Sequence, residues 1–228
     1  MIGSFNPFEL EELAAEYDRW YETPLGAFAE QQELMALQQV LEGLEKGKVI
    51  VEVGAGTGRV AAWLARQGFP VIAVEPAAAM RRYGERRTAG LPVQWIAAHA
   101  YMLPFPDSSQ SAVLFFATLE FITEPQRALR EAVRILQPGG LLLLGLLHAH
   151  SPWAAFYCWL GRRGELPWSQ ARFYTPEEME QYVGIPAEVR AEALFCAPVA
   201  REPLEEADHA GRRAGNAPAF VALRWRKL

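Results

Sequence analysis

The residues best suited to chemistry begin with a glycine-rich segment at residues 54–58, Gly-Ala-Gly-Thr-Gly. It follows an apolar run directly and precedes a stretch with helical spacing of apolar side chains. Because glycine has no Cβ, a ligand can approach the backbone there, and the start of a helix attracts negative charge. A dinucleotide fingerprint needs glycine where Arg59 stands. The segment therefore predicts a cofactor site, and a nicotinamide-dependent oxidoreductase is only an alternative.

A carboxylate follows at Glu75, at the end of the next apolar run, 71–74. In a doubly wound sheet this side chain would lie at the carboxyl edge, beside the glycine-rich segment. An ionised carboxylate accepts hydrogen bonds from two ribose hydroxyls at once. Glu75 is therefore predicted to hold a ribose; a solvated strand end is the alternative.

Apolar runs alternate with helical stretches, as a parallel sheet covered on both faces requires. The runs predict strands at 49–53, 71–75, 93–97, 111–117 and 141–147. The intervening patterns predict helices at 60–65, 77–87 and 124–136. Two later runs, 188–196 and 220–226, predict an antiparallel hairpin at the sheet edge. We expect an α/β fold with a doubly wound, Rossmann-like, mostly parallel seven-stranded sheet.

The remaining segments are expected to complete a single domain over residues 1–228. Residues 1–47 predict an N-terminal helical cap of one or two helices, and 48–147 form the cofactor-binding core. A late insertion, 148–186, is irregular and aromatic, with a helix near 153–160, and is expected to act as a lid. Residues 187–228 carry the terminal strands.

Composition excludes several classes of protein. The 228 residues are 51% hydrophobic, with a net charge of −5. This is enough chain for a large core, and the charge argues against a nucleic-acid partner. The two cysteines, Cys158 and Cys196, are too far apart in sequence to indicate a metal site. No leader and no apolar run of membrane-spanning length is found, so we expect a soluble, cytoplasmic protein without a membrane span.

Four segments together resemble the class I S-adenosylmethionine-dependent methyltransferases. The similarity is to the small-molecule group that includes the ubiquinone and menaquinone biosynthesis enzymes. It covers roughly residues 48–147, in the expected order, and rests on these segments: 51–59 (VEVGAGTGR), 74–76 (VEP) with Met80, 103–107 (LPFPD) and 131–140 (EAVRILQPGG).

The resemblance implies S-adenosylmethionine as cofactor and assigns residues to its parts. Gly54, Ala55 and Gly56 would pass under the methionine part, with Glu52 near its amino group. The other implied contacts are Glu75 with the ribose; Pro76, Met80, His99 and Ala100 with the adenine; Ala117 in the loop over the sulfonium; and Tyr17 and Tyr21, with Trp20, folded over the pocket. An aromatic face suits a sulfonium cation.

Two positions depart from the family pattern. The family usually has an acidic residue where His99 stands, so the contact with the adenine amino group would fall to the backbone of His99 and Ala100. Family members commonly show Phe-Asp where this chain has Gln110 and Ser111. The second difference concerns the start of a strand and does not touch the transfer chemistry.

Methyl transfer from a sulfonium needs few catalytic groups, because the methyl is already activated. A base is required only if the acceptor must lose a proton. Glu120, His148 and His150 are the candidates, since each is expected just beyond a strand end, although the histidines are also explained as solvated loop residues. No carboxylate or thiol close in sequence completes a metal site with the histidines.

The expected partner is a small-molecule acceptor, apolar or aromatic. Aromatic side chains of the insertion are candidates for its pocket, with plain core packing as the alternative: Trp153, Tyr157, Trp159, Trp168 and Phe173. We therefore expect in-line methyl transfer from S-adenosylmethionine to such an acceptor. A noncatalytic S-adenosylmethionine-binding protein is the alternative.

Overall fold

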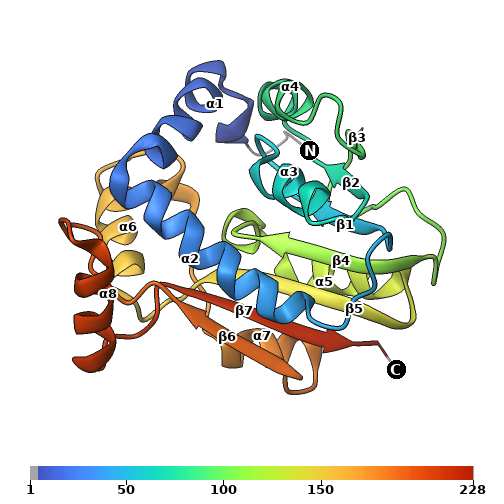
Figure 1. Cartoon of the computed structure of the whole chain (residues 1–228). Helices are drawn as coiled ribbons and strands as arrows, with labels where there is room; N and C mark the ends of the chain where they lie inside the picture. The colour runs from blue at the N-terminus through green and yellow to red at the C-terminus, as the bar shows by residue number, and fades with distance from the viewer. Residues whose placement is uncertain (1–4, 228) are drawn as a thin grey trace.

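A seven-stranded mixed sheet forms the centre of the molecule in a computed structural model that describes residues 5–227 (Figure 1). Its order is β3-β2-β1-β4-β5-β7-β6, with β1 to β5 parallel and β7 antiparallel to both of its neighbours. This confirms the predicted fold class. The strands are β1 (Ile50–Val53), β2 (Val71–Val74), β3 (Val93–Ile96), β4 (Gln110–Phe116), β5 (Leu136–Leu147), β6 (Val189–Ala193) and β7 (Phe220–Arg226).

Helices cover both faces of this sheet. They are α1 (Glu11–Tyr17), α2 (Pro24–Leu41), α3 (Arg59–Arg66), α4 (Ala78–Arg87), α5 (Pro125–Ile135), α6 (Pro152–Arg162), α7 (Pro176–Val183) and α8 (Leu204–Arg213). Short 3-10 turns are η1 (Pro7–Glu9), η2 (Asp18–Glu22), η3 (Leu119–Phe121) and η4 (Trp168–Gln170). In Figure 1, α2 crosses in front of the sheet, and α5 and α7 lie behind it.

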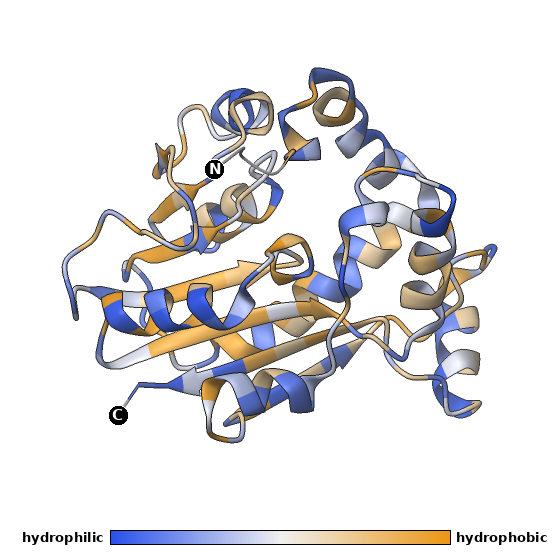
Figure 2. Ribbon diagram, turned by 180° about the vertical axis from the view of Figure 1, so that it is seen from behind, coloured by the Kyte–Doolittle hydropathy of each residue, from blue (hydrophilic) through white to orange (hydrophobic). Residues whose placement is uncertain are grey.

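Alternate residues of the central strands enter two separate apolar cores. Leu114 and Leu143 pack with α2 and α3 on one face, whereas Phe115 and Leu144 pack with α5 and α7 on the other. Figure 2 shows the resulting hydrophobic strands beneath helices with hydrophilic outer surfaces. A strand buried on both faces needs a continuous apolar run, which is why these strands are recognisable in the sequence. Among residues 5–227, no helix has the length and apolar character needed to cross a membrane.

The structure corrects the sequence prediction at the carboxyl end. Residues 188–196 and 220–226 were expected to form an antiparallel hairpin at the edge. Strands β6 and β7 do pair antiparallel, with β6 at the edge, but the connection between them contains the helix α8, which was not predicted. The irregular insertion also contains α7, which starts with a capping box between Thr175 and Glu178. Both helices have acidic first turns, a signal of a helix start.

Candidate active site

A cavity of about 550 Å³ opens at the carboxyl ends of β1, β2 and β4. This volume is in the range of small-molecule sites. Apart from Trp20, every residue predicted to contact the cofactor lines it: Tyr17, Tyr21, Glu52, Gly54, Ala55, Gly56, Glu75, Pro76, Met80, His99, Ala100 and Ala117. The fold therefore gathers into one place residues that the sequence spreads over a hundred positions.

The Glu75 carboxylate is fixed by two backbone amides. Gly56 N–H donates to Oε2 and Ala77 N–H donates to Oε1, each at 2.9 Å. Burial raises the pKa of Glu75, and these hydrogen bonds partly offset that shift. The carboxylate thus ties the glycine-rich segment to the end of β2. Each oxygen keeps a lone pair for a hydroxyl donor in the cavity.

Glu52 is a buried carboxyl group without a full set of partners. It is 2% exposed, and its Oε2 has no hydrogen-bond partner among the described residues. Burial, and then the charge of Glu75, raise the pKa of Glu52 to about 8. An orphaned buried acceptor is costly unless a ligand satisfies it. The residue is therefore suited to a donor group or a cation of a bound molecule.

The N-terminal segment is attached to this cavity through Asp18. Thr57 Oγ1 donates to Asp18 Oδ1 at 2.8 Å, Arg87 pairs with Oδ2, and Arg59 Nη1 lies 3.6 Å away. The Asp18 side chain is only 18% exposed. These contacts join η2 to the glycine-rich segment and to α4, and they place Tyr17 and Tyr21 against the cavity.

An Asp18→Asn variant should therefore lose about 2–3 kcal/mol of folding free energy, because Arg87 would keep a partly buried charge without its carboxylate and Arg59 would keep only Glu30. Glu16→Gln is the matched control, since Glu16 pairs with Arg19 at the surface and both side chains are about 70% exposed. That control should lose less than about 0.5 kcal/mol. Urea unfolding of both variants checks this, and equal losses would contradict the role given to Asp18.

The loop after β4 brings a further carboxylate to the cavity. Glu120 is 1% exposed, and its Oε1 accepts a hydrogen bond from Leu147 N–H at 2.7 Å. Its Oε2 has no partner among residues 5–227, and burial raises the pKa of Glu120 to about 7. Just before it, Ala117 has a left-handed backbone with φ of 46°. Such strain in a non-glycine residue is concentrated at functional sites.

The two histidines predicted as bases are not part of this cavity. The backbone N–H of His148 donates to Ala219 O at 2.9 Å, and its ring packs edge-to-face on that of His150, 5.6 Å between centroids. Neither residue lines the cavity, so of the three candidate bases only Glu120 does. In the described part of the chain, His, Cys, Asp and Glu side chains form no group of three that could hold a metal ion.

The aromatic residues of the insertion do not form an acceptor pocket either. Tyr157 stacks on Trp168 at 3.7 Å between ring centroids, and Trp153 donates its indole N–H to Cys196 O at 2.8 Å. Trp20, expected over the pocket, packs against Trp153 instead. The core-packing alternative therefore fits Trp153, Tyr157, Trp168 and Phe173, whereas Trp159 is 47% exposed. Only Gln170, Arg172 and Tyr174 of the insertion line the cavity.

Glu33 on α2 is a cavity residue that sequence reasoning missed. It is 7% exposed, and burial, with Glu30 and Glu120 nearby, raises its pKa to about 8. The signal was present, because Glu33 shares a helix face with the buried residues Ala29 and Leu37. A carboxylate on an apolar stripe is a candidate functional residue.

Comparisons with known proteins agree with this geometry. A family model described as a methyltransferase domain matches residues 51–144. An S-adenosylmethionine-dependent methyltransferase of Thermotoga maritima, described as a possible histamine N-methyltransferase, has a similar structure with a TM-score of 0.73 and 27% identity, over 96% of this chain and 99% of that one. The chain belongs to the class I S-adenosylmethionine-dependent methyltransferases. S-adenosylmethionine is its methyl donor.

Two curated relatives of the methyltransferase are bacterial proteins. An uncharacterised protein of Mycobacterium tuberculosis is 35% identical over 214 residues, 92% of this chain and 70% of the relative. The demethylmenaquinone methyltransferase of Clavibacter sepedonicus is 38% identical over 99 residues, but these are only 43% of this chain and 40% of that enzyme. The second similarity is therefore partial.

Proposed function

We propose that this methyltransferase transfers the methyl group of S-adenosylmethionine to a small-molecule acceptor by in-line displacement within the 550 Å³ cavity. The observation that carries the proposal is the pairing of Glu75 with the glycine-rich segment. Gly56 and Ala77 hold its carboxylate at the carboxyl edge, and each oxygen keeps a lone pair that a ribose hydroxyl would use.

The residues present fit the donor. The orphaned Oε2 of Glu52 would receive the ammonium of the methionine part. A Cβ on Gly56 would meet no atom within 4 Å, so the backbone leaves free space beside the cavity. The adenine would lie among Pro76, Met80, His99 and Ala100, all of which line the same cavity.

The donor, when bound, supplies a methyl group that its sulfonium has already activated. The chain has to hold the acceptor in line with that methyl, exclude water and receive a proton where the acceptor releases one. Tyr17 and Tyr21 would present aromatic faces to positive charge. Glu120 is the proton acceptor we propose, because it lines the cavity and keeps a free carboxylate oxygen.

A small acceptor with an apolar or aromatic body suits the rest of the lining. Phe8, Phe121 and Ile122 supply apolar walls. The names of the similar proteins support a small acceptor, since one is a demethylmenaquinone methyltransferase and another is described as a possible histamine N-methyltransferase.

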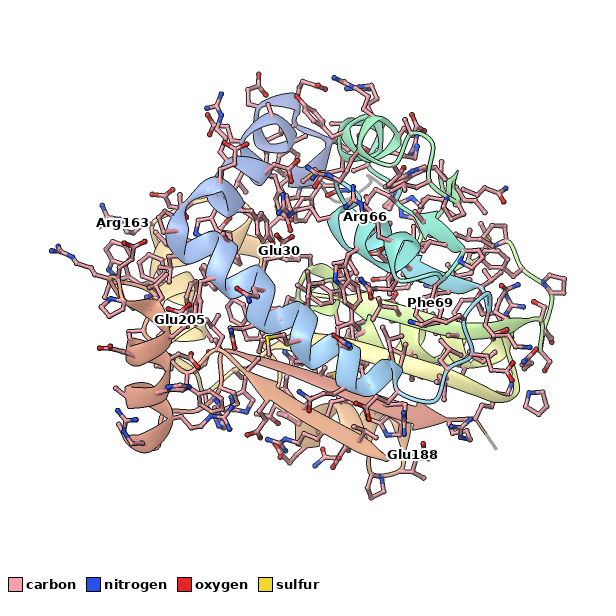
Figure 3. All side chains as sticks on the ribbon, viewed as in Figure 1. Glu30, Arg66, Phe69, Arg163, Glu188 and Glu205 are labelled. Carbon is pink, nitrogen blue, oxygen red and sulfur yellow. The ribbon has the colours of Figure 1, made fainter. Side chains whose placement is uncertain are left out.

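Calorimetry with S-adenosylmethionine, S-adenosylhomocysteine and NADH tests the cofactor site. The two sulfur compounds should bind in the micromolar range and NADH should not. Glu75→Gln should lower the affinity for both sulfur compounds about 10- to 100-fold, because a charged acceptor for the ribose hydroxyls is lost. Glu205→Gln, on exposed α8, removes the same charge far from the cavity and should change nothing (Figure 3). Failure of the wild type to bind either sulfur compound would refute the proposal.

A further inference from the structure

Two cavity carboxylates without an ion-pair partner among residues 5–227 remain once the donor contacts proposed above are assigned. Glu33 comes from α2 and Glu120 from η3, and both line the cavity. Glu33 is 7% exposed and Glu120 is 1% exposed. The two carboxyl groups are close enough to each other that the charge of Glu120 contributes to the raised pKa of Glu33. Glu52 and Glu75 already match the ammonium and the ribose of the donor. The site therefore contains two more carboxyl groups than the donor contacts proposed above require.

Nothing in the described chain neutralises these two groups. Arg59 at the start of α3 also lines the cavity, but it donates through Nε to Glu30 Oε1 at 2.6 Å and lies 3.6 Å from Asp18. Figure 3 shows Glu30 on the side of α2 that faces α3. Arg172 is 65% exposed and pairs loosely with Glu178 at 3.8 Å. Among residues 5–227 neither Glu33 nor Glu120 forms an ion pair.

The unpartnered oxygen of Glu120 is the second observation that points to a ligand. It is buried beside the cavity and has no hydrogen-bond partner in residues 5–227, whereas the other oxygen of the same carboxylate is held by Leu147 N–H. The ring of Tyr17 lines the same space, as do those of Tyr21 and Tyr174, each of which already has a guanidinium over one face, from Arg59 at 4.2 Å and from Arg172 at 5.0 Å. Carboxylates beside tyrosine rings form a site for an organic cation.

We propose that the acceptor is a small primary or secondary amine whose nitrogen is held between Glu33 and Glu120. This rests on the proposed function, since the amine would occupy the acceptor end of the same cavity. The amine binds as its ammonium, and its apolar body contacts Phe121 and Ile122, which also line the cavity.

The transfer balances with no further reactant. The ammonium gives one proton to Glu120, which frees the nitrogen lone pair. That pair forms the new N–CH₃ bond as the C–S bond breaks, and the bonding electrons stay on sulfur. The products are an N-methylammonium and S-adenosylhomocysteine, and the proton on Glu120 leaves to solvent. Burial, which raises the pKa of Glu120 to about 7, suits the carboxylate to this proton transfer.

Calorimetric titration of the protein saturated with S-adenosylhomocysteine tests the inference without requiring turnover. The probes are a panel of amines from propylamine to 2-phenylethylamine and N-methyl-2-phenylethylamine, each matched with a neutral alcohol such as 2-phenylethanol. At least one amine should bind about tenfold or more tightly than its alcohol. Mass spectrometry should find the N-methylated product of that amine when S-adenosylmethionine replaces S-adenosylhomocysteine.

Three variants locate the effect. Glu33→Gln and Glu120→Gln keep the shape of the side chain. Each should lower the affinity for the amine about 10- to 100-fold and leave the affinities for the alcohol and for S-adenosylhomocysteine unchanged. Glu205→Gln should leave the affinities for the amine, the alcohol and S-adenosylhomocysteine unchanged. Preserved S-adenosylhomocysteine binding with no amine preference in the panel overturns the amine inference alone. Loss of S-adenosylhomocysteine binding in the two variants, with the amine unaffected, would overturn it as well, because the carboxylates would then serve the donor.

Discussion

A Gly54→Ala variant should lose about 2–5 kcal/mol of folding free energy, which is a large part of the stability of a domain. Gly54 has a φ of 77°, and a Cβ there would lie 2.2 Å from Cγ2 of Thr118. Thr118 cannot turn away freely, because its Oγ1 donates to Phe116 O at 2.9 Å. The added methyl therefore brings both a left-handed backbone penalty and a collision between β1 and the loop after β4.

Gly56→Ala is the matched comparison, since Gly56 also has a positive φ, 54°, but a Cβ there would meet no atom within 4 Å. Its stability should fall by only about 1–2 kcal/mol, the cost of the backbone conformation. Its affinity for S-adenosylhomocysteine should nevertheless fall, because Gly56 lines the cavity. Urea unfolding and calorimetry measure the two effects separately.

Thr118→Ser in the Gly54→Ala background should recover part of the lost stability, because serine lacks the colliding Cγ2. The same substitution in the Gly56→Ala background should recover none. Equal stability losses for the two alanine variants, with no recovery by Thr118→Ser, would show that the close packing of Gly54 is unimportant.

The sheet could be predicted from sequence because its central strands are buried on both faces. The apolar run at 111–117 gave β4 to within one residue. The start of β5 was harder to predict: the strand begins at Leu136 and not at Leu141, because the turn residues before Leu141 also pair with the end of β7. Gly139 N–H donates to Lys227 O, and Lys227 N–H donates to Gly140 O. Such pairing depends on a strand almost ninety residues further along the chain.

The candidate site likewise contains residues that could be predicted from the sequence and residues that could not. Residues for the donor lie in local motifs at strand ends, and the alternation of strands and helices gathers them. The apolar helix face that Glu33 shares with Ala29 and Leu37 indicates that its carboxylate is buried. That it reaches this cavity depends on how α2 docks across the sheet, which no local motif indicates. His148 and His150 were expected at an open strand end. The chain through Tyr174 covers that end, since Ala149 N–H donates to Tyr174 O at 3.0 Å.

The folding stability of the protein without ligand should decrease as the pH rises from about 6.5 to 8.5, and Glu52 should carry much of this dependence. Burial raises its pKa from 4.5 to about 8, so the native state keeps a proton that the unfolded chain has released. The resulting stability is fully present below about pH 4.5 and is lost as the pH rises through about 8. For Glu52 alone, the loss of folding free energy between about pH 6.5 and 8.5 is about 2 kcal/mol.

Glu52→Gln should therefore have a flatter stability profile than the wild type, and the melting temperatures of the two proteins should change relative to each other by about 4–8 °C between pH 6.5 and 8.5. His148 and other titrating groups affect both proteins alike, so the difference isolates Glu52. Glu205→Gln, an exposed carboxylate, should follow the wild type. Thermal unfolding at several pH values checks this, and parallel profiles for the wild type and Glu52→Gln would contradict it.

Saturating S-adenosylhomocysteine should flatten the wild-type profile, because an ammonium beside Glu52 would keep the carboxylate ionised in the native state. The ligand should not change the slope of Glu52→Gln, which has no charge to lose, and it should bind that variant more weakly. The same substitution would thus stabilise the free protein at pH 8.5 and weaken its cofactor site. Such opposite effects are expected where a buried carboxylate is retained for binding at the expense of the free fold.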